Sequence, residues 1–193
     1  MKINKFSQTT LKQSDLALMW IKTKLSNSSA KEIALKICNN QIKIPKNLQL
    51  KTIIDVLKTK ISTNELLSLS TVTGNCEVIK IILKDFNPKD RKLCLKSYLN
   101  NQTDSKLTPL HVAADNGFSD VIKTLLNDFN QEDRKYFLEK EDIHGSTPLH
   151  MAAWENHKIA IETLITLGSN ENKKDLSGLS PKFILENPFI NKH

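Results

Sequence analysis

The chain has 193 residues, of which 39% are hydrophobic and 25% charged, and its formal net charge is +7. This composition predicts one globular domain or one solenoid, and no apolar run approaches the roughly 20 residues that a membrane-spanning helix needs. The three cysteines lack the spacing of a zinc site, which favours ordinary thiols in a reducing compartment.

The first 62 residues hold most of the positive charge. They contain twelve lysines against three acidic residues, a net charge of +9, whereas residues 63–193 have a net charge of −2. Only Arg91 and Arg134 among the 28 basic residues are arginine, which disfavours a sequence-specific reader of nucleic acid. Binding of residues 1–62 to acidic membranes or nucleic acid is an alternative, which a salt-sensitive lipid or DNA shift would support.

Helices are predicted in the second half of this basic segment. The sequence SAKE (29–32) is a capping box before an apolar face, and a further helix is expected from about 47 to 60. The apolar run LALMWI (16–21) is short and has no cleavage site after it, so a signal peptide is not expected. The predicted location is the cytoplasm, or a host cell after export. The apolar residues on the two helices are Ile33, Ala34, Ile37 and Cys38, and then Leu50, Ile53, Ile54 and Leu57.

An internal repeat follows. Residues 107–118 read LTPLHVAADNGF, and residues 146–157 read STPLHMAAWENH. The register holds through the next apolar helix, and a period of this size predicts a stacked array. A degenerate copy occupies residues 65–86, and LSP (179–181) begins a shortened one.

Each repeat can be read as two short helices. Thr108 and Thr147 are predicted N-caps before a helix that opens with proline. Gly117 and Asn156 are predicted to end this first helix in the left-handed conformation. A second helix follows, ended by Gly168 in the later copy. The repeats are stretched by the related segments FNPKDRKLCL and FNQEDRKYFL, which predict extra helices at about 88–99 and 131–139.

These motifs resemble the ankyrin repeat family. Asp142, Gly145, Thr147 to His150, the Ala-Ala pair, His157 and Gly168 fit its pattern, whereas Lys106 replaces a glycine in the earlier copy. The resemblance implies an all-α ankyrin-type helix-turn-helix solenoid with an N-terminal helical cap. The predicted boundaries are 1–62 for the cap, 63–100 for the degenerate repeat, 104–139 and 142–174 for the clear repeats, and 175–193 for the truncated unit.

The resemblance also implies a function. An ankyrin array is expected to bind an unidentified protein through its concave groove and finger hairpins, as a monomer and without catalysis, metal, cofactor or small-molecule substrate. His111 and His150 would order the hairpins by hydrogen bonding. Trp154 would anchor the partner, because tryptophan is enriched among interface hot spots; alternatively it packs on Ile143 or the C-terminal cap. The predicted partner-binding residues are Trp154, Glu155, Asp115, Asn116, Ile143, His144, Asp104 and Ser105.

The sequence shows two further, weaker resemblances. Residues 44–72 look somewhat like the F-box, a three-helix adaptor that docks a ubiquitin-ligase scaffold, although the tryptophan of its third helix is missing. In addition, the bias toward Lys, Asn and Ile and the stretched repeats are similar to ankyrin proteins of obligate intracellular bacteria, which would make a host protein the target.

Overall fold

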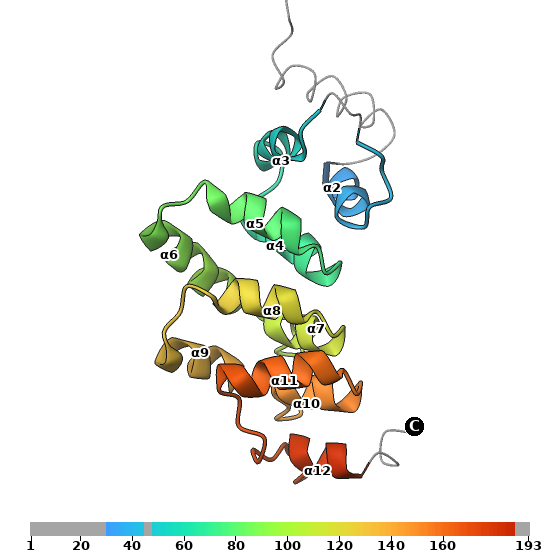
Figure 1. Ribbon diagram of the computed structural model, residues 1–193, viewed down its shortest axis with the longest axis vertical. Helices are drawn as coiled ribbons and strands as arrows, with labels where there is room; N and C mark the ends of the chain where they lie inside the picture. Colours follow the sequence, from blue (N-terminus) through green and yellow to red (C-terminus); the bar gives the residue numbers. More distant parts are fainter. Residues whose placement is uncertain (1–29, 45–47, 188–193) are drawn as a thin grey trace, which may run out of the picture. The chain divides into compact units, whose positions relative to one another are not determined.

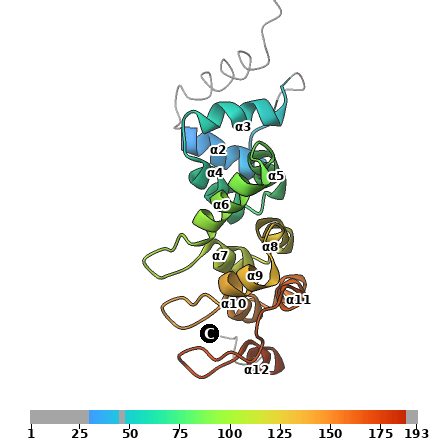
Figure 2. The ribbon, with the colours of Figure 1, turned by 90° about the vertical axis from the view of Figure 1, so that its left-hand side faces the viewer.

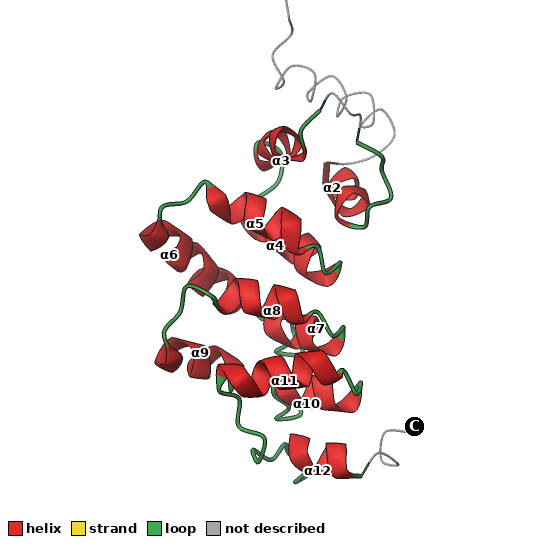
Figure 3. Ribbon diagram, viewed as in Figure 1, coloured by secondary structure: helices red, strands yellow, loops and turns green. Residues whose placement is uncertain are grey.

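The computed structural model describes residues 30–44 and 48–187, and all regular secondary structure in these ranges is helical (Figure 3). The predicted all-α fold is therefore confirmed. The chain divides into two compact units, residues 1–62 and residues 63–193.

The first unit contains two described helices. Helix α2 (Ala30–Cys38) buries all four residues of its predicted apolar face. Helix α3 (Leu50–Lys58) buries Ile53, Ile54 and Leu57 as predicted, together with Val56, while Leu50 is half-buried. The capping residue Ser29 and the segment 16–21 lie outside the described residues. The role of this unit as a cap on the array stays a prediction.

The second unit is a stack of helix pairs (Figure 1). The inner helices α4 (Thr63–Val72), α7 (Pro109–Asp115), α10 (Pro148–Trp154) and α12 (Pro181–Glu186) contact one another in that order. The outer helices α5 (Cys76–Lys84), α8 (Ser119–Leu126) and α11 (Lys158–Leu167) form a second row. Helices α4, α7 and α10 each also contact the outer helix that follows them, as in α4 with α5.

The core lies between these two rows. Each outer helix buries one apolar face, and the inner helices α7 and α10 contribute the fully buried Ala-Ala pairs. Alanine leaves little side chain between backbones, so successive inner helices can approach closely. The buried outer-helix set is Val78, Ile79, Ile82, Leu83, Val121, Ile122, Leu125, Leu126, Ala160, Ile161 and Leu164.

The turn inside each pair uses a residue with positive φ. Gly74 has φ +69°, Gly117 has φ +70°, and Asn156 has φ +56°. Each of the two glycines lies against an aromatic ring of the following repeat. A Cβ on Gly74, for example, would come within 2.8 Å of Phe118. The predicted left-handed positions are therefore confirmed, and glycine is needed at the first two for space as well as conformation.

Two extra helices connect the repeats, as predicted. Helix α6 (Pro88–Leu99) begins at Asn87, whose side chain accepts a bond from a backbone N–H of the first turn, and α9 (Gln131–Leu138) begins at Asn130 in the same way. The Tyr98 hydroxyl lies 2.8 Å from Thr71 Oγ1 and ties α6 to α4. Burial raises the pKa of Tyr98. These helices make the repeats longer without interrupting the stack.

Candidate functional site

Three loops project to one side of the stack, before α7, α10 and α12 (Figure 2). We call them fingers 1, 2 and 3, comprising residues 103–107, 142–146 and 175–179. Each is closed by a backbone bond between its ends, as from Asp142 N to Ser146 O over 3.0 Å. Neighbouring fingers are also joined, because Ile143 N donates to Ser105 O and Leu176 N donates to His144 O. The tips therefore form one continuous edge.

A carboxylate holds each of the two later fingers. Asp142 Oδ1 accepts from the backbone N–H groups of His144 and Ser146, both at 2.8 Å. Asp175 Oδ1 does the same for Ser177 and Leu179, at 2.9 Å.

Finger 1 is built differently. The hydroxyl of Thr103 stands in for the carboxylate and accepts from Leu107 N at 3.1 Å. Lys106 occupies the glycine position with φ +58°, a conformation that costs a residue with a side chain about 1–2 kcal/mol. Finger 1 should therefore be the least stable of the three.

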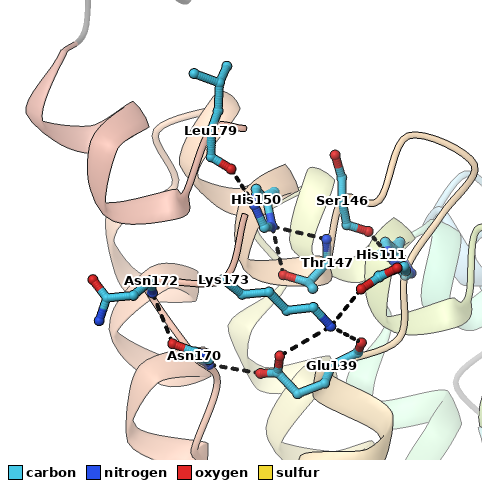
Figure 4. A network of polar contacts seen from close by, with 10 residues as sticks. His111, Glu139, Ser146, Thr147, His150, Asn170, Asn172, Lys173 and Leu179 are labelled. Atoms are coloured by element: carbon cyan, nitrogen blue, oxygen red, sulfur yellow. Dashed lines mark hydrogen bonds and ion pairs between the residues drawn. The ribbon is translucent and has the colours of Figure 1, made fainter. Parts of the chain in front are cut away.

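Two buried histidines anchor the fingers (Figure 4). His111 Nδ1 accepts from Thr108 N at 3.1 Å and lies 2.8 Å from the Thr108 hydroxyl. Its Nε2 donates to Ser146 O, 3.0 Å away at the end of finger 2. A backbone N–H can only donate and a carbonyl can only accept, so the ring is neutral and protonated on Nε2.

His150 repeats this arrangement one unit later. It joins Thr147 to Leu179 O, which is 3.3 Å from its Nε2 at the end of finger 3. Burial lowers the pKa of both His111 and His150. The two side chains are thus structural links between one repeat and the finger of the next, as the resemblance to ankyrin repeats implied.

A third connection supports finger 3. Lys173 Nζ donates to the Glu139 carbonyl oxygen at 2.8 Å (Figure 4). The same ammonium group pairs with Glu141 at 2.9 Å. Asn170 N donates to the Glu139 carboxylate at 2.8 Å. The end of α9 is therefore tied to the turn that leads into finger 3.

The exposed side of the inner helices differs between repeats at one equivalent position. The 43- and 39-residue offsets of the repeats bring Val72, Asp115 and Trp154 into register. Val72 is 55% exposed and Asp115 is exposed, whereas Trp154 is half-buried. One turn earlier in α7 and α10, Val112 and Met151 are also half-buried. The surface is thus a mixture of apolar side chains and carboxylates.

A small pocket opens beside finger 1, with a volume of about 230 Å³. It lies between α4, α7 and the chain leaving α6. Its apolar walls include Val72, Leu107, Pro109 and Val112.

The family follows from comparison with known proteins. The model of ankyrin repeats in three copies matches residues 67–175, which is more than half of the chain. The chain belongs to the ankyrin repeat family. A search of the curated proteins found no match. The ankyrin match begins within α4, so it includes the degenerate repeat, and it ends at the start of finger 3.

The predicted binding residues fall into two groups on the ankyrin array. Asp104, Ser105, Ile143 and His144 are exposed at the tips of fingers 1 and 2. The others lie at the carboxyl ends of α7 and α10: Asp115, Asn116 and Glu155 are exposed, and Trp154 is half-buried. The seven-residue inner helix separates the two groups by about 10 Å.

Trp154 is half-buried because it lies in the last turn of a helix that packs on both α7 and α12. Its role as an anchor for a partner stays a prediction. More open apolar side chains occur elsewhere on the same surfaces, at Leu176 (79% exposed) and Ile143 (46%) on the fingers. Leu176 and Val72 are not among the predicted binding residues, although the repeat alignment places Val72 at the position equivalent to Trp154.

Within 30–44 and 48–187, no group of three or more His, Cys, Asp or Glu side chains is arranged to hold a metal ion. None of the helices described there is long and apolar enough to cross a membrane. Ankyrin repeats indicate a protein–protein interaction module, and a non-catalytic scaffold is typical of this fold.

Proposed function

We propose that the protein binds a partner protein through the concave surface of its ankyrin array and the tips of its fingers, without catalysing a reaction. The observation that carries this proposal is the continuous, hydrogen-bonded edge of the three fingers, which presents Ile143 and Leu176 to solvent. Exposed apolar side chains on a rigid frame lose little conformational entropy when they bind, and this favours affinity.

The charge of the surface indicates the partner's character. Asp104 lies at the tip of finger 1, and Asp115 and Glu155 lie at the exposed ends of α7 and α10. Complementary charges accelerate association and favour one orientation. The partner segment should therefore combine basic residues with apolar ones that reach Ile143, Leu176 and the pocket beside Val72.

Charge reversal tests this proposal. Asp115→Lys with Glu155→Lys should slow association with the partner at least tenfold, because it removes two attractive charges and adds two repulsive ones. The matched control is Asp120→Lys with Glu162→Lys, which makes the same change on exposed positions of the outer helices. Equal effects of both variants would mean that only net charge matters, and the concave surface would lose its role.

The F-box alternative gains no observation in its favour. The last helix of its segment, α4, packs against α5 and α7 as the inner helix of the first ankyrin repeat. Residues 67–72 also belong to the ankyrin match. A host protein as target rests on the compositional resemblance to bacterial ankyrin proteins and awaits identification of the partner.

A further inference from the structure

An open cleft lies on the outer side of the array, between α5 and α8. Its volume is about 490 Å³, and α6 contributes to its wall. Four of its eight lining residues are basic and one is acidic, although residues 63–193 as a whole have a net charge of −2. The lining residues are Lys80, Leu83, Lys84, Arg91, Lys123, Thr124, Asn127 and Asp128.

The acidic side chain at this cleft is already neutralised. Arg91 Nη2 lies 3.2 Å from Asp128 Oδ1, and Nε of the same guanidinium binds the other carboxylate oxygen. The Lys123 ammonium group lies 3.8 Å from the Asp120 carboxylate, and both side chains are strongly exposed. Such a long, exposed ion pair contributes little energy. In the part of the chain that the structure describes, no ion pair is recorded for Lys80 or Lys84. Three lysine charges are thus left facing the cleft.

The next groove along the outer face lacks this concentration of lysines, so the excess positive charge is confined to the cleft between α5 and α8. Lys80, Lys123 and Glu162 occupy equivalent positions in successive repeats. The groove between α8 and α11 is accordingly lined by Lys123 and Glu162, an opposite-charge pair. The first groove instead sets Lys80 against Lys123, with Lys84 one helical turn further along α5. Like charges in neighbouring positions repel, so the fold alone does not favour this arrangement.

We propose that this cleft binds a compact polyphosphate group. Lysine ammonium groups bind phosphate as point charges, and the Asn127 amide adds hydrogen-bond donors beside them. The Thr124 hydroxyl lies 3.0 Å from Cys76 Sγ, and it can donate to the anion while it accepts from the thiol. The pairing with Arg91 screens Asp128, so it does not repel the anion. The cleft lies on the outer helices, away from the fingers, and the proposal is independent of partner binding at the concave surface.

The test is a titration of the full-length protein with inorganic tripolyphosphate, in which two-dimensional NMR monitors the backbone amide resonances. Site-resolved signals are needed because the basic residues 1–62 also attract anions. Saturable shifts are expected at Lys123, Thr124 and Asn127. Lys80→Gln with Lys84→Gln and Lys123→Gln should weaken the binding read at Thr124 at least tenfold.

The control makes the same charge change elsewhere in the second unit. Lys135, Lys158 and Lys182 are exposed, and their joint substitution by Gln should change the dissociation constant at Thr124 less than twofold. Equal weakening by both triple variants would show general electrostatic attraction and overturn the site. Absence of saturable shifts at Lys123 and Thr124 up to millimolar tripolyphosphate would overturn it as well. All the substituted lysines are exposed, so the variants should stay folded.

Discussion

The imidazole of His157 lies directly against Gly117. A Cβ built on that glycine would come within 2.8 Å of the ring, and His157 Nε2 donates to the Asp115 carbonyl oxygen at 2.9 Å. One side chain thus joins the turn of one ankyrin repeat to the start of the next outer helix. The pair Gly74 and Phe118 makes the same close approach one repeat earlier, but an apolar ring replaces the hydrogen bond.

Gly117→Ala should therefore lower the free energy of unfolding by about 2–3 kcal/mol. The left-handed conformation contributes about 1–2 kcal/mol of this, and displacement of the ring contributes the rest. Gly178→Ala is the matched control, because its φ of +80° is similar but nothing lies within 4 Å of the added Cβ. Chemical denaturation measures both. Equal losses would mean that the contact with His157 has no energetic importance.

Acid should destabilise the array through His111 and His150. Burial lowers the pKa of both below the ordinary value of about 6.5, so the neutral forms stabilise the fold. This stability is fully present above pH 6.5 and is lost as the pH falls below it. Thermal unfolding between pH 8 and pH 5 should show the midpoint decreasing below about pH 6.5.

The double variant His111→Gln with His150→Gln separates this effect from other titrations. It should unfold at a lower temperature at pH 7.5, because the links to Ser146 and Leu179 are weakened. Its midpoint should also depend less on pH between 6.5 and 5 than that of the wild type. An unchanged pH dependence would contradict the assignment to these two rings.

Lys106→Gly should stabilise the protein. The lysine has φ +58° at the position where fingers 2 and 3 have Gly145 and Gly178. Relief of this conformation is worth about 1–2 kcal/mol, and the greater freedom of glycine in the unfolded chain removes up to about 1 kcal/mol of the gain. The expected net increase is about 0.5–1 kcal/mol, measured by denaturant unfolding. Destabilisation would mean that the lysine side chain makes a contact that outweighs the strain.

Trp154→Ala should affect stability as well as binding. If the ring were fully buried, its removal would lower the free energy of unfolding by about 3–5 kcal/mol. Because the ring is half-buried, we expect a decrease of about 2 kcal/mol. Binding by this variant must therefore be measured at a temperature where it is shown to be folded by circular dichroism. A loss below about 0.5 kcal/mol would mean that the ring makes little contact with its own fold.

Much of this fold could be predicted from the sequence, because repetition reveals which residues are structural. The two Thr-Pro-Leu-His motifs locate the inner helices and predict the role of His111 and His150. The related segments FNPKDRKLCL and FNQEDRKYFL likewise mark the extra helices. These signals are local in the chain, and each residue acts through neighbours that the repeat places at known positions.

The exposure of individual surface residues was harder to predict. Trp154 shares a repeat position with Asp115 and Val72, but how far each is covered depends on the neighbouring helices and not on its own repeat. The basic cleft was missed for a similar reason. Lys80 and Lys123 are separated by 43 residues, and their equivalence matters only once the two outer helices lie side by side.

Binding through the fingers is the central claim, and a pair of matched double variants tests it most directly. Ile143→Ser with Leu176→Ser removes the apolar tips, which are 46% and 79% exposed. Leu93→Ser with Ile159→Ser makes the same change on the helices, at positions that are both 67% exposed. Quantitative affinity purification with the full-length protein should show that the wild type and the helix variant retain the same amount of partner. The finger variant should retain at least tenfold less. Equal retention by both double variants, or loss with the helix variant alone, would contradict recognition through the fingers.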